Sequence, residues 1–172
     1  MPVILVRIDD RLMHGQIVEG WLKIIDVDVV LIASDAVAQD ETQKILMAMT
    51  VPNNVKLVIK NLDEAANVII SGRYNEEKIM VLTISPSDVL YMLDNGADFK
   101  SVNVGGMHFT NGKRQLLYNI YVDDLDLENL YKIHRKGIEI DGRVFPRDEK
   151  TNIMRLIERE YLAVYKSVDT NK

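Results

Sequence analysis

A cluster of charged and nucleophilic side chains lies within eight positions near the start of the chain. Arg7, Asp9, Asp10, Arg11 and His14 supply two arginines, two carboxylates and one imidazole. A neutral imidazole can attack phosphorus and then carry the phosphoryl group, and an adjacent guanidinium can hold the phosphate oxygens. The residue types therefore predict phosphoryl transfer, with His14 as the nucleophile.

The flanking sequence predicts how this cluster is positioned. Residues 3–6 form a short apolar run, and residues 17–25 repeat apolar side chains at helical spacing, so a strand, a loop and a helix are expected. His14 and Gly15 fall where that helix begins. The free backbone N–H groups and the dipole at such a point favour a phosphoryl group and disfavour imidazolium. We therefore expect a neutral His14.

The spacing also suggests roles for the other members of the cluster. Arg11, three residues before His14, could reach the same phosphate as a planar fork, which lysine cannot do. Arg7 falls at the end of the strand and could instead pair with Asp9 or Asp10. Either carboxylate could accept the N–H of His14 and fix its tautomer, or could simply hold the loop by bonding backbone N–H groups. The sequence does not choose between these alternatives.

Beyond this loop, strand-like apolar runs alternate with helical patterns. This alternation predicts an α/β fold: an open, mainly parallel, twisted sheet of about seven strands with helices on both faces. One helix is expected over residues 36–49, with Ile45, Leu46 and Met49 on its inner face. The apolar runs lie at residues 29–33, 56–60, 79–84 and 101–104, with a short strand at 119–122 and a last strand, interrupted by Gly142, at 138–145.

Ligands of parallel sheets bind at the carboxyl ends of the strands, and this rule groups further candidates with the His14 loop. Gly15 would let a phosphate or a partner approach the backbone, and Gln16 completes the loop. Paired glycines after a strand are more often a turn than a phosphate cradle. His108 lies near the same rim, and the sequence leaves open whether it has a functional role. The rim candidates are Ser34, Asp35, Gly105, Gly106 and His108.

Length and composition set the outer limits. The 172 residues fit one domain, expected over residues 1–166, with a frayed tail at 167–172. A net charge of −5 argues against nucleic acid as a partner, and the absence of cysteine excludes thiolate chemistry. There is no apolar run of membrane-spanning length and no cleavable signal pattern, so a cytoplasmic protein is expected.

Three segments carry a resemblance to a known family. Residues 7–16 (RIDDRLMHGQ), residues 34–40 and residues 103–107 resemble the enzyme IIB components of the sugar phosphotransferase system, in its mannose/fructose/sorbose branch. Met13 stands where the family form has isoleucine. The likeness runs through nearly the whole chain, and residues 107–113 are more similar to the N-acetylgalactosamine members than to the mannose ones.

The resemblance implies that His14 accepts phosphate from a phosphohistidine on an enzyme IIA partner. The phosphate would then pass to a sugar held by membrane subunits of the enzyme IIC and IID type, with which the chain would associate peripherally. No metal or nucleotide cofactor is expected, Nδ1 is the expected phosphorylated nitrogen, and the last of seven strands should run antiparallel. The rival hypothesis is a non-catalytic regulatory module that binds an anion or small ligand on a Rossmann-like scaffold.

Overall fold

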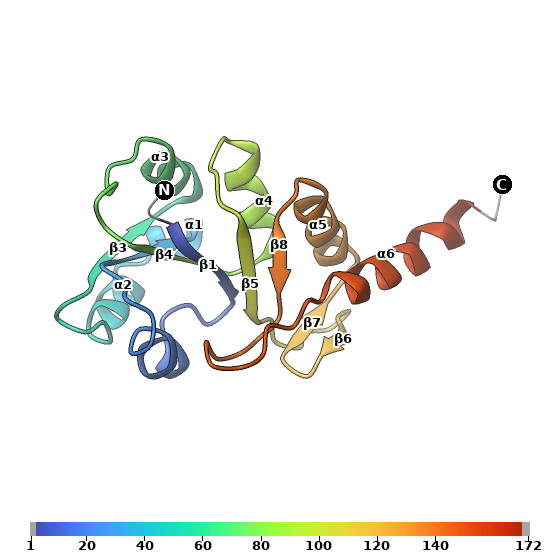
Figure 1. The fold of residues 1–172 in the computed structure, drawn as a ribbon, viewed down its shortest axis with the longest axis horizontal. Helices are drawn as coiled ribbons and strands as arrows, with labels where there is room; N and C mark the ends of the chain where they lie inside the picture. Colours follow the sequence, from blue (N-terminus) through green and yellow to red (C-terminus); the bar gives the residue numbers. More distant parts are fainter. Residues whose placement is uncertain (1–2, 170–172) are drawn as a thin grey trace.

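The computed structural model describes residues 3–169, within which six strands form one sheet in the order β3-β2-β4-β1-β5-β8 (Figure 1). Every neighbouring pair in this sheet is parallel. A separate antiparallel hairpin consists of β6 (Arg114–Leu117) and β7 (Ile120–Val122). The strands of the main sheet are β1 (Val3–Asp9), β2 (Val29–Ala33), β3 (Lys56–Lys60), β4 (Ile79–Thr83), β5 (Ser101–Gly106) and β8 (Glu139–Asp141).

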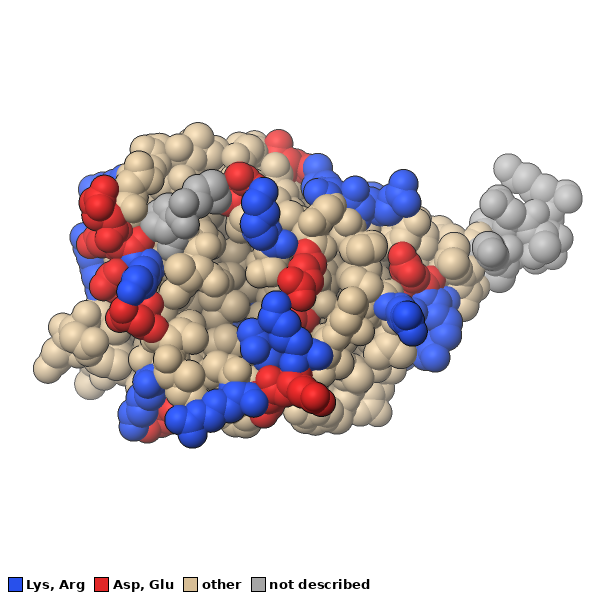
Figure 2. Space-filling model, viewed as in Figure 1, with Lys and Arg blue, Asp and Glu red and all other residues tan. Residues whose placement is uncertain are grey.

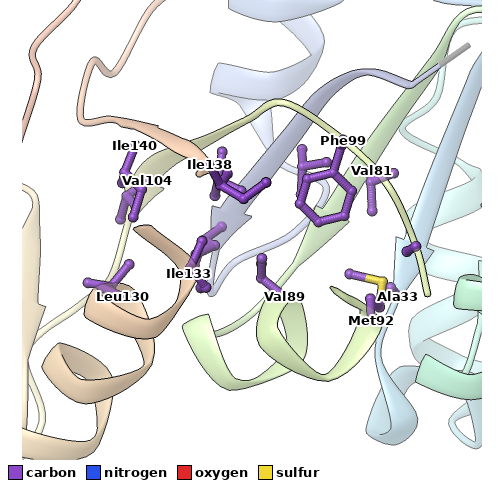
Figure 3. Close-up of a cluster of buried hydrophobic side chains, with 14 of the residues drawn as sticks. Ala33, Val81, Val89, Met92, Phe99, Val104, Leu130, Ile133, Ile138 and Ile140 are labelled. Atoms are coloured by element: carbon purple, nitrogen blue, oxygen red, sulfur yellow. The ribbon is translucent and has the colours of Figure 1, made fainter. Parts of the chain in front are cut away.

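Helices cover both faces of the sheet. One face packs against α3 (Leu62–Ile70), α4 (Pro86–Asp94), α5 (Asp124–Arg135) and the start of α6 (Met154–Asp169). Figure 3 shows part of this cluster, in which side chains from the sheet meet those from α4 and α5. The other face packs against η1 (Gln16–Trp21), a single wide π-helical segment, and against α1 (Asp35–Ala38) and α2 (Glu41–Ala48).

The alternation of side chains along β1 positions the functional cluster. Val6 and Ile8 point into the core formed with α3, α4 and α5, whereas Leu5 belongs to the core on the other face. Because successive residues of a strand alternate between faces, Arg7 and Asp9 project to the same side as Leu5. That side is the one covered by η1.

Polar side chains cap the first turns of α3 and α4. Asn61 accepts a hydrogen bond from the backbone N–H of Glu64 at the start of α3, and Ser85 accepts one from Asp88 at the start of α4. These bonds satisfy N–H groups that would otherwise have no partner in the first turn of a helix.

The helix predicted over residues 36–49 is wrong in two respects. Two short helices, α1 and α2, replace it, and Asp40 caps the second by accepting from the N–H of Gln43. An Asp that bonds the backbone in this way ends one helix and begins the next. The restart also turns α2, so that Ile45, Leu46 and Met49 are 61%, 58% and 79% exposed rather than buried.

The α/β class and the mainly parallel sheet are confirmed, but two details of the topology are corrected. The strand predicted at residues 119–122 belongs to the β6–β7 hairpin, so the main sheet has six strands within residues 3–169 rather than about seven. The last strand, β8, is parallel to β5 rather than antiparallel. The chain reaches β8 through the crossover helix α5, which returns it in the same direction. At the end of β8, Asp141 also forms an isolated antiparallel bridge with Asn152.

The C-terminal helix α6 begins against α5 and projects away from the sheet (Figure 1). Of the tail predicted to fray, residues 170–172 lie outside the described residues.

Among the residues that the structure describes, no helix combines the length and apolar character needed to cross a bilayer. Within the same residues, no group of three or more His, Asp or Glu side chains could hold a metal ion.

Candidate active site

The loop between β1 and η1 turns sharply after Asp9. The backbone N–H of Leu12 donates to the carbonyl oxygen of Asp9 at 2.9 Å, and Leu12 has a φ of 54°, the left-handed region that a leucine rarely adopts. Its buried side chain packs with Trp21 and Ile17 in the core under η1, and this packing holds the turn. The turn brings His14 back over the end of β1.

His14 contacts Asp9 through one ring nitrogen and the loop backbone through the other. Its Nε2 lies 3.0 Å from Asp9 Oδ2, and its Nδ1 accepts from the N–H of Gln16 at 3.3 Å. An ionised carboxylate only accepts hydrogen bonds, so the proton of a neutral His14 lies on Nε2. Nδ1 therefore keeps its lone pair, and the side chain is 15% exposed.

The choice between the two carboxylates is thus resolved in favour of Asp9. Asp10 accepts instead from the backbone N–H of His108 at 2.7 Å, and its other oxygen lies 2.5 Å from His108 Nδ1. Asp10 therefore ties the loop to the segment that leads into the β6–β7 hairpin. His108, one of the rim candidates of the sequence, lies beside the loop through this contact.

The charge of Asp9 is stabilised although its side chain is buried. Burial alone would raise the pKa of Asp9, but the hydrogen bond with His14 and the charge of Arg7 outweigh it, and the pKa lies below the ordinary value. Arg7 Nη2 is 2.9 Å from Asp9 Oδ2, so one carboxylate oxygen contacts both Arg7 and His14. Asp9 is ionised at neutral pH.

Arg11 lies on the outer side of the same carboxylate. Its Nε is 3.4 Å from Asp9 Oδ1, its Nη2 donates to Gln16 Oε1 at 2.8 Å, and its side chain is 40% exposed. Arg7, by contrast, is completely buried. Of the two arginines, Arg11 is the one that an incoming phosphate can meet without rearrangement.

A pocket of about 240 Å³ opens beside Arg11 and Gln16. The β6–β7 hairpin supplies much of its far wall, and sequence reasoning missed these residues as site members. The sequence predicted a strand at 119–122, but it gave no signal for the partner strand β6 or for the direction in which the hairpin folds. The hairpin residues that line the pocket are Tyr118, Asn119 and Tyr121.

The other rim candidates have local structural contacts. Ser34 caps α1 by accepting from the N–H of Val37, and Asp35 accepts from the N–H of Leu62 at the start of α3. No heavy atom lies within 4 Å of where a side chain of Gly15 would begin, so the backbone there is open to approach. Gly105 and Gly106 lie within β5, beside the side chains of Arg7 and Asp9 respectively.

Comparisons with known proteins match almost the whole chain to one family. The family described as "PTS system sorbose subfamily IIB component" matches residues 3–167. The fructose-specific EIIB component of Bacillus subtilis (strain 168) is 34% identical over 91% of this chain and 96% of its own length. The mannose-specific EIIAB component of Escherichia coli (strain K12) is 36% identical over 92% of this chain, which spans 49% of that longer protein.

Solved structures give the same result. The IIBSor domain of the sorbose permease from Klebsiella pneumoniae superposes with a TM-score of 0.86 at 32% identity, covering 92% of this chain and 98% of that one. Sequence, fold and the placement of the RIDDRLMHGQ loop at the carboxyl end of β1 thus converge. The chain belongs to the sorbose subfamily of phosphotransferase-system IIB components.

Proposed function

We propose that His14 is the phosphoryl acceptor of this phosphotransferase and that Nδ1 is the atom that attacks. The observation that carries the proposal is the contact of His14 Nε2 with Asp9 at 3.0 Å, which favours the tautomer in which Nδ1 carries no proton and its lone pair accepts only the N–H of Gln16. The relatives are phosphotransferase components, and none is a non-catalytic anion-binding module. Family membership therefore favours covalent transfer over simple binding.

The reaction has two displacements at phosphorus. In the first, Nδ1 of His14 attacks the phosphoryl group of a phosphohistidine on an enzyme IIA partner, and the donor nitrogen recovers the electron pair of the P–N bond. In the second, a sugar hydroxyl attacks the same phosphorus, His14 leaves as a neutral imidazole, and the hydroxyl proton is lost. The N–H of Gln16 donates to Nδ1, and Arg11 donates to the side chain of the same Gln16, so both groups lie where they can stabilise phosphate oxygens.

Two partners follow from this sequence of steps. An enzyme IIA protein or domain supplies the phosphoryl group, as suggested by the Escherichia coli relative named as an EIIAB component. Membrane subunits of the enzyme IIC and IID type present the sugar, and we propose that the chain meets them at the cytoplasmic side of the membrane. The relatives named for fructose, mannose and sorbose are 34%, 36% and 32% identical, so none of these sugars is singled out.

Phosphoryl transfer tests the proposal directly. The purified chain is incubated with phosphoenolpyruvate, the general phosphocarrier proteins and an enzyme IIA partner, and the intact mass is measured. We expect a gain of one phosphoryl group, lost in His14→Gln and retained in His108→Gln and His134→Gln. Labelling that persists in His14→Gln would refute the assignment.

A further inference from the structure

Arg7 is a charged side chain that the proposed reaction does not use directly. Its guanidinium is fully buried between β1, β5 and η1, so it cannot contact a phosphate delivered to the surface of His14. Burial of an unpaired cation is strongly unfavourable, and a retained buried arginine therefore needs specific partners. The question is what this arrangement does for the site.

The partners of Arg7 hold it from several directions. Nη2 contacts Asp9 Oδ2 at 2.9 Å, and Nη1 donates to Asn103 Oδ1 at 2.5 Å and to the carbonyl oxygen of Val144 at 3.3 Å. The Cζ atom lies 5.1 Å from the ring centroid of Trp21. These contacts fix the guanidinium relative to β5, η1 and the segment that follows β8, and through it they fix Asp9.

The paired glycines of β5 make this arrangement possible. A Cβ atom at Gly105 would lie 1.7 Å from Cζ of Arg7, and one at Gly106 would lie 3.1 Å from Oδ1 of Asp9. Neither glycine has the positive φ that would demand glycine on conformational grounds. Gly105 is therefore neither a turn nor a phosphate cradle. The guanidinium of Arg7 occupies the space that a side chain at position 105 would fill.

We propose that Arg7 is a positioning residue that sets the tautomer of His14. It holds Asp9 ionised and in place, so that the proton of His14 stays on Nε2 and Nδ1 presents its lone pair. This inference rests on the proposed role of His14 as phosphoryl acceptor. When Nδ1 takes the phosphoryl group, the ring keeps its Nε2 proton and becomes cationic, and the Asp9 carboxylate that faces it stabilises that charge.

The tautomer can be measured without any reaction. The ¹⁵N chemical shifts of the His14 ring at neutral pH should report a proton on Nε2 in the wild-type chain. Arg7→Met removes the charge but keeps an unbranched apolar side chain, and we expect it to give a mixture of tautomers. Labelling by the enzyme IIA partner should slow by roughly 10–100-fold, the loss typical of residues that orient a functional histidine from behind.

Three further variants separate positioning from folding. Arg7→Lys keeps the charge without the fork that joins Asp9 to Asn103, so it should retain more of the Nε2 tautomer and more labelling than Arg7→Met. Gly105→Ala should act like a weaker form of Arg7→Met, because the added methyl group displaces the guanidinium. Arg143→Met is the control, since Arg143 also lies over Trp21 but contacts Asp141 and the carbonyl oxygen of Pro146.

The outcomes distinguish this inference from the function on which it rests. If folded Arg7→Met or Gly105→Ala keeps the wild-type tautomer and labelling rate, the role of Arg7 is disproved while His14 remains the acceptor. A wild-type chain that takes up no phosphate would overturn the proposed function, and the ¹⁵N spectra would still decide whether Arg7 controls the tautomer. If Arg7→Met does not fold, Arg7→Lys and Gly105→Ala supply the same comparison.

Discussion

At the scale of single residues, two arginines contact one carboxylate, that of Asp9, from opposite sides. Arg7 is buried behind Asp9, and Arg11 lies half-exposed in front of it. The two have the same charge and differ in what they can touch. Only the exposed one can follow a phosphoryl group as it arrives and leaves, so substitutions at the two positions should have different effects.

Arg11→Lys should slow transfer to the sugar while the fold stays intact. Lysine keeps the positive charge but loses the planar fork that reaches Asp9 and Gln16 together. Because position 11 is half-exposed, the free energy of unfolding should change by no more than about 0.5 kcal/mol. Sugar phosphorylation rates and denaturant unfolding measure the two effects. Wild-type transfer in this variant would mean that Arg11 takes no part in the reaction.

Asp9→Asn should destabilise the protein in a pH-dependent way. The pKa of Asp9 is lower in the folded protein than its ordinary value of 3.8. The ionised carboxylate therefore stabilises the fold at pH values above 3.8, and this stabilisation is lost as the pH falls through the lower folded-state pKa. At pH 7 the variant leaves Arg7 buried without its anion and should lose about 3–5 kcal/mol. The difference in the free energy of unfolding between this variant and the wild type should become smaller in acid. Denaturant unfolding at neutral and acidic pH measures it, and a gap independent of pH would contradict the assignment.

At the scale of elements, the sequence predicted best what depends on neighbouring residues. The strand–loop–helix around His14 follows from local periodicity, and the caps at Asn61 and Ser85 follow from residue type. What it could not predict depends on distant pairing. Arg7 meets Asn103 and the Val144 carbonyl across separations of 96 and 137 residues, and no local pattern encodes such contacts.

The exposed face of α2 provides a prediction at this scale. Ile45→Ala should change the free energy of unfolding by no more than about 0.5 kcal/mol, because its side chain is 61% exposed. Ile133→Ala in α5 is the matched comparison: that side chain is fully buried, and the loss should be about 2–5 kcal/mol. Denaturant unfolding of both variants measures the contrast. Equal losses would mean that α2 packs through its apolar face after all.

At the scale of the whole molecule, the surface is suited to brief encounters. On the face drawn in Figure 2, Lys and Arg side chains lie among Asp and Glu side chains rather than forming a field of one sign. A carrier that must meet a donor and then an acceptor gains from short-lived complexes. We therefore expect small, mostly polar contacts around the His14 loop, burying roughly 1,200 Å² or less in total.

The donor and the acceptor should compete for one surface around His14. Arg11→Glu reverses the charge there and should slow both transfers, whereas Arg159→Glu in α6, where the side chain is exposed and pairs with Glu160, should slow neither. Binding of enzyme IIA in the presence of the membrane subunits measures the competition. Simultaneous binding of both partners without interference would rule out a shared surface.

The strand order limits when β1 can pair with its neighbours during synthesis. β1 lies between β4 and β5, both of which follow it in the chain by about 70 residues or more. During synthesis, the strand that carries Arg7 and Asp9 leaves the ribosome without either neighbour. One edge of β1 can pair with β4 only after residue 83 has emerged, and the other can pair fully with β5 only after residue 106. The guanidinium of Arg7 lacks its last partner until Val144 follows. The loop that carries His14 is thus made before the strands and the segment that complete its surroundings.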